Sequence, residues 1–500
     1  MDIVVLLFLT SGLFLGWSLG ANDAANVFGT AVGTRMVAFT TAAVVCSIFI
    51  VLGAVFSGTG AAHTLGKLGA VNALGGSFMA AMAAAFTVYW MTKLGLPVST
   101  SQAVVGAILG WNIFSGSITD MNALLKILGT WVACPLLAAF IAAPLSLATE
   151  AFLSRAKFHV FRIDAYTRIA LILAGAFGSY ALGANNIANV MGVFVPSSPF
   201  TDFNVGELFR VTSIQQLFLL GAIAIAVGVF TYSKKVMLTV GGGLMPLSPV
   251  MAWVVVVSHS IVLFLFASEG LEHLLASNGL PTIPLVPVSS SQAVVGAVIG
   301  IGLMRNGGRN IDWRVLGRIS GGWVTTPVIS AVFCFVALFF LQNVFNQQVY
   351  SPVSFVLSEP VVMKLEEKGI SPKKINELIG QRFETGSDLL SAIKKQTSLS
   401  TDETKEIILI AQVSQTEINA ERLDVFTKDA QRTDWISQHQ IDAVWALKGA
   451  HFEHKWMLQD ALIAQAKEWR PLPSNKVNKL FNKGINQRFE HVYRSFSVKE

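Results

Sequence analysis

The chain has 500 residues, of which 53% are hydrophobic and 13% carry charge, and its mean hydropathy is +0.58. Because soluble domains carry about 25% charged residues, this composition excludes a protein that is water-soluble from end to end, and it equally excludes a disordered chain. The three cysteines all lie inside apolar runs, so a disulfide scaffold is excluded as well.

Ten segments are long and apolar enough to be predicted as membrane crossings, since a helix that crosses a bilayer needs about 20 mostly apolar residues. The first segment has small polar residues near its middle and no basic start, so we do not interpret it as a cleavable signal. The Gly-rich stretch 236–250 could contain a further re-entrant piece. In chain order the predicted crossings are 2–33, 36–56, 73–92, 97–115, 121–148, 169–193, 214–231, 250–268, 287–304 and 320–343.

The charges are distributed unevenly along the chain. Residues 1–350 contain 15 Lys and Arg and 10 Asp and Glu, whereas residues 351–500 contain 21 and 20. The net charge of +6 therefore divides into +5 and +1. The basic excess of the first part lies mostly in short loops, where it reports membrane orientation, so nucleic-acid binding is not implied. The last 150 residues have the composition of a water-soluble domain.

Basic residues in short loops mark the cytoplasmic side of a membrane protein. Three clusters agree with one orientation, because even numbers of predicted crossings separate them. We therefore expect an integral protein of the cell (inner) membrane with its N-terminus outside, Arg35 and Lys93 inside, and the loop with Asp202 and Glu207 outside. The same count places the C-terminal domain outside, in the periplasm of a two-membrane bacterium. The clusters are Arg155, Lys157, Arg162 and Arg168; Lys234 and Lys235; and Arg305, Arg309, Arg314 and Arg318.

Two polar motifs occur twice and in the same order. Residues 18–29 (SLGANDAANVFG) and 181–192 (ALGANNIANVMG) are identical at 8 of 12 positions. Residues 97–110 (PVSTSQAVVGAILG) and 287–300 (PVSSSQAVVGAVIG) are identical at 11 of 14. Five predicted crossings in each half would invert the second copy. Inverted repeats with interrupted helices indicate a secondary transporter whose site lies near the bilayer midplane.

These observations predict an all-α polytopic membrane protein made of two inverted-topology repeats with broken or re-entrant helices, followed by a soluble helical domain. The predicted boundaries are membrane repeat 1 at 1–149, a basic cytoplasmic connector at 150–168, membrane repeat 2 at 169–345, a linker at 346–357 and the soluble domain at 358–500.

The first motif places a carboxylate, Asp23, at membrane depth, where an uncompensated charge is costly and indicates function. Gly20 and Gly29 would let the helix open, and unwound carbonyls with Asn and Asp oxygens suit a small hard cation such as Na⁺. The alternative is a polar helix–helix interface, which the inverted repetition makes the weaker interpretation. The predicted cation-binding residues are Asn22, Asp23, Asn26, Asn185, Asn186 and Asn189, with Na⁺ at all of these except Asn186 and no transition metal.

The second motif begins a helix, because proline suits the first helical turn and Ser and Thr cap helix N-termini. Free N–H groups, hydroxyls and a positive dipole end make such a start an anion site without Arg or Lys. The alternative is a cap that serves only its own helix, and again the two inverted copies argue against it. The predicted anion-binding residues are Ser99, Thr100, Ser101, Gln102, Ser289, Ser290, Ser291 and Gln292.

An anion cannot enter an inside-negative cell favourably alone, because each charge moved against 100 mV costs about 2.3 kcal/mol. Uptake therefore requires coupled cations. We expect an oxyanion symporter with no cofactor beyond its coupling ion.

The run Gly20-Ala21-Asn22-Asp23-Ala24-Ala25-Asn26, together with Pro97-Val98-Ser99-Thr100-Ser101-Gln102, resembles the PiT family of inorganic phosphate transporters over about residues 1–345. The resemblance implies phosphate symport with Na⁺, or with H⁺ in some members, by an inverted-repeat helical fold with both termini outside. It implies that substrate and cation bind at the paired motifs. The residues carried over are Asn22, Asp23, Asn26, Ser99, Thr100, Ser101, Gln102, Asn185, Asn189, Ser289, Ser290, Ser291 and Gln292.

The second Gly-Ala-Asn block departs from the family pattern, because Asn186 stands where a second Asp is usual. Asn186 offers a carbonyl oxygen but no charge, which leaves open the number and identity of the coupled cations. Alternatives to phosphate are sulfate or another tetrahedral oxyanion. A further alternative is a sensor that binds an oxyanion without transport and signals through the C-terminal domain. The spans contain no convergent nucleophile and base, so we do not expect an enzyme.

Several features outside the motifs are less informative. His259 lies in an apolar span, where a hydrogen-bonded packing role is favoured over proton relay. His451 and His454 beside Glu453 make only a weak metal pattern. The C-terminal domain could serve regulation, dimerisation or docking of an unknown partner, and a homodimer is possible. Its predicted helices are 359–369, 373–381, 386–397, 401–430, 434–468 and 474–493.

Overall fold

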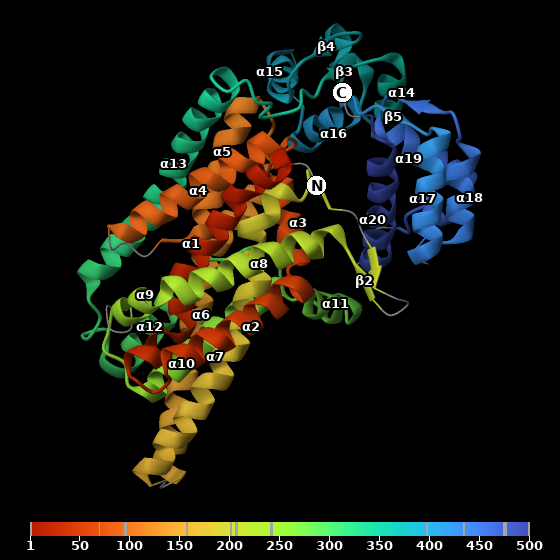
Figure 1. Cartoon of the computed structure of the whole chain (residues 1–500). Coiled ribbons are helices and arrows are strands. Elements are labelled where there is room, and N and C mark those ends of the chain that lie inside the picture. Colours follow the sequence, from red (N-terminus) through yellow and green to blue (C-terminus); the bar gives the residue numbers. More distant parts are fainter. Residues whose placement is uncertain are drawn as a thin grey trace.

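The computed structural model describes residues 3–69, 71–94, 98–156, 159–200, 203–205, 209–240, 244–396, 399–433, 436–473 and 478–498. It is almost entirely helical, with a long-helix bundle and a C-terminal region of short helices beside it (Figure 1). Eight of the described helices are long and apolar enough to cross a membrane. The predicted fold class is confirmed.

The bundle consists of the helices before residue 344 and one small hairpin. Its elements are α1 (Ile3–Gly33), α2 (Phe39–Ser57), α3 (Thr59–Leu68), α4 (Leu74–Lys93), α5 (Thr100–Ser115), α6 (Met121–Ala156), α7 (Val160–Met191), η1 (Gly192–Phe194), β1 (Phe203–Val205), β2 (Phe209–Val211), α8 (Ser213–Thr231), α9 (Ser233–Val240), α10 (Pro249–Ala267), α11 (Glu269–Ser277), α12 (Ser290–Asn306) and α13 (Trp313–Asn343).

The two halves of the bundle are packed into each other. Helix α1 packs against α8 of the second half, and α7 packs against α2 of the first. In the same way α5 packs on α13 and α12 packs on α6. Equivalent glycines make these contacts close: a Cβ added at Gly20 would collide with the Ile225 carbonyl oxygen, and one at Gly183 with that of Ile50. Matching contacts of matching residues indicate a pseudo-twofold relation between the halves.

Helices α4 and α5 form a hairpin that enters and leaves the bundle at the same end. Asn72, just before α4, donates to the Ser351 carbonyl at 2.8 Å and accepts from the Ser351 N–H at 2.9 Å. Trp111 of α5 donates to the Val349 carbonyl at 2.9 Å, so both open ends of the hairpin are held by residues 349–351. The other end of α4, at Lys93, lies beside the middle of α1.

Helices α10 and α12 form the matching hairpin of the second half. The Asp312 N–H, just after α12, donates to the Leu244 carbonyl just before α10 at 3.2 Å. Four of the ten predicted crossings therefore pack in pairs as two hairpins, 73–92 with 97–115 and 250–268 with 287–304. Lys93 lies at the end of the first arm of the first hairpin, beside the middle of α1.

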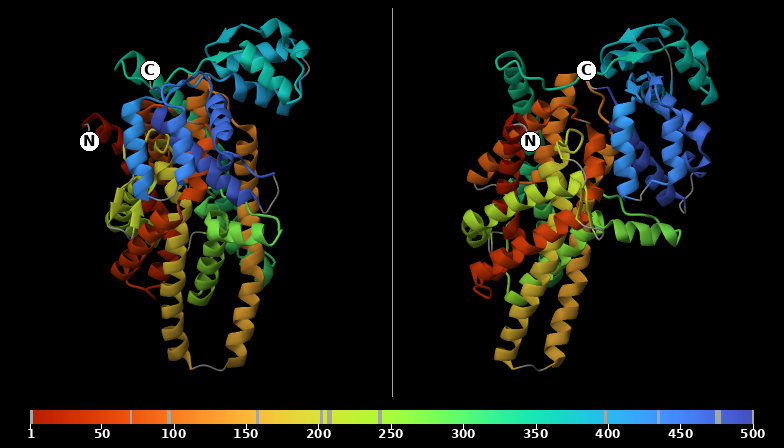
Figure 2. Two further views of the ribbon diagram at one scale, coloured as in Figure 1. Left: turned by 90° about the vertical axis from the view of Figure 1, so that its right-hand side faces the viewer. Right: turned by 45° about the vertical axis from the view of Figure 1, so that its right-hand side comes forward.

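Besides the hairpins, three candidate crossings remain in each half, which is still an odd number. These are α1, α2 continued by α3, and α6 in the first half, and α7, α8 continued by α9, and α13 in the second. Helix α1 begins in the upper half of the bundle, whereas α7 begins at the lower tip where it meets α6 (Figures 1 and 2). The second half is thus inverted relative to the first. Pro97, Lys157, Asp202 and Glu207 lie outside the described residues.

The C-terminal region contains two copies of one structural unit. In each copy a first strand pairs with a second, and the chain then returns to the first strand after two helices. Gly380 and Gly449 occupy matching positions, both at φ +80°, and donate to the carbonyls of Leu357 and Ile418 at 2.8 and 2.7 Å. Unit one contains β3 (Phe355–Val356), α14 (Glu359–Glu367), η2 (Pro372–Lys374), η3 (Asn376–Leu378), β4 (Arg382–Phe383), α15 (Gly386–Gln396) and α16 (Thr401–Ala411). Unit two contains β5 (Thr416–Glu417), α17 (Ala420–Thr433), α18 (Gln438–Ala446), β6 (His451–Phe452), α19 (Lys455–Gln465), η4 (Lys467–Trp469) and α20 (Lys479–Phe496).

This arrangement corrects three of the predicted helices. The predicted helix 401–430 is interrupted by β5, the predicted helix 434–468 is interrupted by β6, and 373–381 forms two 3₁₀ turns. The interruptions have a common cause, because β5 and β6 pair with each other at Thr416 and Phe452. Such pairing between distant residues overrides local helical periodicity.

The C-terminal region touches the bundle through unit one. The backbone N–H and the hydroxyl of Ser387 both donate to the Gly116 carbonyl, at 3.3 and 2.9 Å. Gly116 is the left-handed C-cap of α5. Unit two contacts unit one, since Trp456 of α19 donates to the Ile410 carbonyl of α16 at 3.0 Å. The region is therefore connected to the end of the same helix whose beginning carries Thr100.

Candidate anion and cation site

Helices α5 and α12 begin in the same way inside the bundle. Ser99 and Ser289 are their N-caps, and each hydroxyl accepts a hydrogen bond from the backbone N–H three residues on, at 3.3 Å in both cases. The caps have extended backbone, so the chain arrives straight and turns into the helix at this point. The remaining N–H groups of the first turn are left for other acceptors.

The two helix starts meet each other by reciprocal hydrogen bonds. The Ser101 hydroxyl donates to the Val288 carbonyl at 3.2 Å, and the Ser291 hydroxyl donates to the Val98 carbonyl at 3.4 Å. Ser101 corresponds to Ser291 in the repeated motif, and Val98 corresponds to Val288. The pseudo-twofold axis therefore passes between the two N-termini, and their positive dipole ends converge there.

The Gly-Ala-Asn motifs of α1 and α7 meet on the same axis. Asp23 and Asn186 occupy equivalent motif positions, and the Asn186 amide donates to Asp23 Oδ2 at 3.3 Å. The other oxygen, Asp23 Oδ1, accepts from Asn22 Nδ2 at 3.0 Å. Among the described residues, the hydrogen bonds to this buried carboxylate come from two side-chain amides, which compensate its charge incompletely.

Two further amides connect these motifs to the helix starts. Asn189 Nδ2 donates to Ser101 Oγ at 2.8 Å and to Asn186 Oδ1 at 3.2 Å. Asn26 Nδ2 donates to Ser290 Oγ at 3.0 Å. The structure therefore brings all four repeated blocks together into one group of side chains, which we call the cradle. The cradle consists of Asn22, Asp23, Asn26, Ser99, Thr100, Ser101, Gln102, Asn185, Asn186, Asn189, Ser289, Ser290, Ser291 and Gln292.

The cradle is buried yet has unused hydrogen-bonding groups. Every member except Asn26 is less than 9% exposed. Four of its buried polar atoms have no hydrogen-bond partner among the described residues: Thr100 Oγ1, Gln102 Oε1, Asn189 Oδ1 and Gln292 Oε1. A buried polar atom without a partner costs about 1–3 kcal/mol. Such a group of unpaired atoms at one place indicates that a polar ligand completes it.

Asn185 has a role that the sequence did not indicate. Its Oδ1 accepts from the Val288 N–H at 2.9 Å, and its Nδ2 donates to the Val286 carbonyl at 3.2 Å. Both ends of this amide are therefore engaged by the extended chain that precedes α12. The contact holds that chain straight, so Asn185 supports the geometry of the second helix start.

His259 lies at the site, although the sequence favoured a packing role for it. It lies in α10, has no exposed surface, and its Nε2 is 2.9 Å from Ser290 Oγ. The signal that could have indicated it is its place in the segment preceding the second Pro-Val-Ser motif. That segment becomes the first arm of the hairpin and therefore lies against α12.

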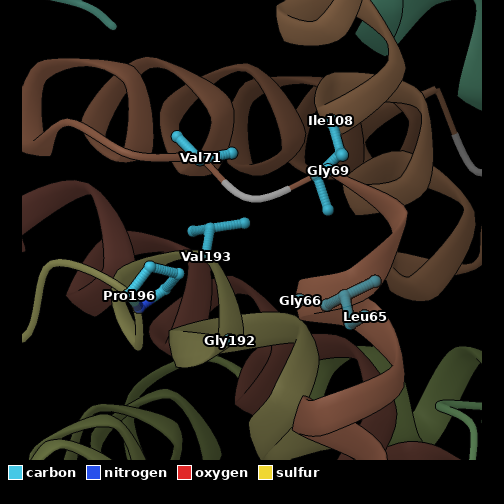
Figure 3. A pocket seen from close by; sticks show the side chains of 8 residues that line it. All are labelled: Leu65, Gly66, Gly69, Val71, Ile108, Gly192, Val193 and Pro196. Carbon is cyan, nitrogen blue, oxygen red and sulfur yellow. The ribbon is translucent and has the colours of Figure 1, made fainter. Parts of the chain in front are cut away.

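Neither of two pockets in the bundle replaces the cradle as the candidate site. A small pocket between α3, α5 and η1 is lined only by apolar residues and glycines, so it offers nothing to an anion (Figure 3). Its lining is Leu65, Gly66, Gly69, Val71, Ile108, Gly192, Val193 and Pro196. A second cleft reaches Asn22 and is bordered by Trp17, Tyr89, Lys93 and Tyr232.

Two hairpins that enter from opposite sides and present buried helix starts to each other define an inverted-repeat membrane transporter. Comparison with known sequences identifies which kind. The profile of the phosphate transporter family matches residues 19–273 and 274–485, and the chain belongs to that family. The predicted family resemblance is confirmed, and so is the expectation of a transporter and not an enzyme.

Individual relatives are more distant. A protein of Methanocaldococcus jannaschii named as a phosphate permease is 25% identical over 336 residues, which cover 67% of this chain and 97% of that protein. The sulfate permease of Bacillus subtilis is 26% identical over 347 residues, covering 66% of this chain and 85% of the permease. The fold is similar to a solved structure of a sodium-dependent phosphate transporter, with TM-score 0.54 and 22% identity over 68% of this chain and 99% of that one.

Proposed function

We propose that this protein takes up inorganic phosphate by symport with a cation, Na⁺ in preference to H⁺, through alternating access around the cradle. The observation that carries this proposal is the reciprocal pair of hydrogen bonds from Ser101 to Val288 and from Ser291 to Val98. These bonds put two helix N-termini from opposite sides of the membrane at one place. An oxyanion between them would receive N–H and hydroxyl donors from both halves.

The unpaired acceptors favour phosphate over sulfate. Gln102 Oε1 and Gln292 Oε1 have no donor among the described residues, and both lie in the first turns of the facing helices. Phosphate at neutral pH retains at least one P–O–H group, which can donate to such an oxygen, whereas sulfate carries no proton. A buried acceptor left unpaired by the wrong anion lowers its affinity substantially.

The cation is proposed to bind at Asp23, with oxygen ligands from Asn22, Asn26 and Asn189. Asn189 Oδ1 is buried and has no donor within the described part of the chain, so it is available as a ligand. Carboxylate and amide oxygens suit Na⁺, and a cation would neutralise the Asp23 charge. Na⁺ and phosphate would then stabilise each other by their opposite charges, which couples their binding.

Sulfate is the second candidate substrate. The similarity to the Bacillus subtilis sulfate permease and the neutral Asn186 both favour it. A site with one fewer carboxylate repels a dianion less. An oxyanion sensor that signals through the C-terminal region is a further alternative, and the contact of Ser387 with Gly116 would be its route.

Uptake by the full chain in proteoliposomes distinguishes these functions. We expect radiolabelled phosphate to accumulate under an inward Na⁺ gradient, with weak accumulation under a proton gradient alone and weak inhibition by excess sulfate. Accumulation of sulfate in place of phosphate under the same gradients would identify sulfate as the substrate. Binding of phosphate without any flux would support the sensor and refute the transporter.

We also propose that both termini lie outside the cell. The joined ends of α6 and α7 carry Arg155, Arg162 and Arg168, and they project from the bundle opposite to the C-terminal region (Figure 2). Basic residues at short connections favour the cytoplasmic side. With that tip inside, the C-terminal region faces the periplasm of a two-membrane bacterium.

A further inference from the structure

Ser290 differs from the other hydroxyls of the cradle because two side-chain nitrogens lie within hydrogen-bond distance of its oxygen. Asn26 Nδ2 donates to Ser290 Oγ at 3.0 Å, and His259 Nε2 lies 2.9 Å from the same atom. Ser290 is the first residue of α12 and is 2% exposed. Its hydroxyl is therefore shielded from bulk water, and the two neighbouring side chains determine where its proton points.

The surroundings of His259 indicate which ring nitrogen carries the proton. Its Nδ1 is buried and has no partner among the described residues. A proton on Nδ1 would leave a buried N–H unpaired, and unpaired buried donors are rarer in native proteins than unpaired acceptors. The proton is therefore assigned to Nε2, from which it is donated to Ser290 Oγ.

This assignment fixes the orientation of the Ser290 hydroxyl. A hydroxyl oxygen has two lone pairs and one proton. The N–H groups of Asn26 and His259 occupy both lone pairs, so Ser290 can act toward a third group only as a donor. No protein acceptor receives that proton among the described residues, and Ser290 stands at the helix start where the oxyanion is proposed to bind.

The first half of the protein lacks a matching pair of donors among its described residues. Thr100 is the counterpart of Ser290, and its Oγ1 has no hydrogen-bond partner in the described ranges. Helix α4, the counterpart of α10, contains no histidine. The two halves are therefore chemically unequal at matching positions: one hydroxyl is free to rotate, and the other is held as a donor.

We propose that His259 is a positioning residue that fixes the Ser290 hydroxyl as a hydrogen-bond donor to the transported oxyanion. This inference rests on the proposed function of the cradle as an oxyanion site. His259 does not touch the anion. It acts through Ser290, and an orientation fixed before binding removes the cost of ordering that hydroxyl when the anion arrives.

Two substitutions of His259 separate a donor from a packing side chain. His259→Gln keeps an N–H donor near the position of Nε2, whereas His259→Leu keeps bulk and removes the donor. In the full chain in proteoliposomes, we expect His259→Leu to raise the KM for phosphate about tenfold with little change in maximal rate, as loss of one hydrogen bond to a charged group predicts. His259→Gln should stay within about threefold of the wild type.

A double-mutant cycle with Ser290→Ala tests whether the effect passes through Ser290. We expect His259→Leu combined with Ser290→Ala to raise KM no more than Ser290→Ala alone, because the hydroxyl to be oriented is gone. Additive effects would overturn the proposal. So would an unchanged KM in His259→Leu, or equal losses of rate in His259→Leu and His259→Gln, which would indicate packing.

Phosphate binding to the purified wild-type protein, measured calorimetrically, separates this proposal from the one it rests on. Wild-type protein that binds no oxyanion would overturn both. Wild-type protein that binds phosphate with the same affinity as His259→Leu would overturn the role of His259 and leave the proposed function standing. Thermal unfolding of each variant in detergent shows whether a change in KM accompanies a change in stability.

Discussion

Replacing Asp23 with asparagine is expected to lower Na⁺-dependent phosphate uptake by about 100-fold or more, equivalent to about 3 kcal/mol of lost cation stabilisation. Asp23 is the one carboxylate of the cradle and is 3% exposed. The substitution preserves shape but removes the charge that would hold the cation. Initial rates of radiolabelled phosphate uptake in proteoliposomes, with Na⁺ varied at constant ionic strength, measure the effect.

The position of Asn186 provides a matched control for Asp23→Asn. Because Asn186 donates to Asp23 across the axis at 3.3 Å, Asn186→Asp would place a carboxylate almost where the first was removed. We expect the double variant D23N/N186D to recover most of the uptake that D23N loses. Unchanged cation dependence of uptake in D23N would contradict the cation assignment. An equal loss of uptake in D23N and in D23N/N186D would contradict it as well.

Replacing Gly106 with alanine is expected to destabilise the bundle by about 1–3 kcal/mol, because overpacking forces the backbone to move. A Cβ at Gly106 would collide with the Pro327 carbonyl oxygen where α5 crosses α13. The mirror-related Gly296 meets the Pro135 carbonyl oxygen in the same way. Thermal unfolding of detergent-solubilised protein, monitored by size-exclusion chromatography, measures the loss of stability.

Gly129 in α6 is the matched control for Gly106. A Cβ at Gly129 has no neighbour within 4 Å, and alanine favours a helix over glycine by about 1 kcal/mol. Gly129→Ala should therefore be as stable as the wild type or slightly more stable. Gly106→Ala with the stability of Gly129→Ala would show that α5 is not held closely against α13.

The cradle could be predicted from the sequence because its chemistry contrasts with its surroundings. Asp23 and the runs of Ser and Thr stand out in a chain that is otherwise apolar. Their repetition, with an odd number of predicted crossings in each half, predicted that the second copy is inverted. The contacts between Asp23 and Asn186, and between Ser101 and Val288, then follow from placing the two copies about one axis.

The hairpins could not be predicted in the same way. The segments 73–92 and 250–268 satisfy the length and hydropathy of a crossing, and those criteria do not report depth. Depth is set by tertiary partners, such as Ser351 for Asn72 and Leu244 for Asp312. These partners are distant in sequence and have no local signal.

The same limit explains the role of His259 and the duplication of the C-terminal region. Sequence places His259 in an apolar span, but only packing brings its Nε2 to Ser290. The two C-terminal units share their strand pairing, and Gly380 and Gly449 have the same backbone conformation. Few identical side chains indicate the relation between the units. Helical spacing alone therefore predicted continuous helices there.

A cryo-electron microscopy map of the full chain in lipid nanodiscs, recorded with Na⁺ and phosphate, tests most directly whether both halves build one site. We predict density for one tetrahedral anion between residues 99–102 and 289–292, contacted by the Ser290 hydroxyl, with a cation against the Asp23 carboxylate. An anion held by one half alone, or at a place away from these residues, would contradict the account.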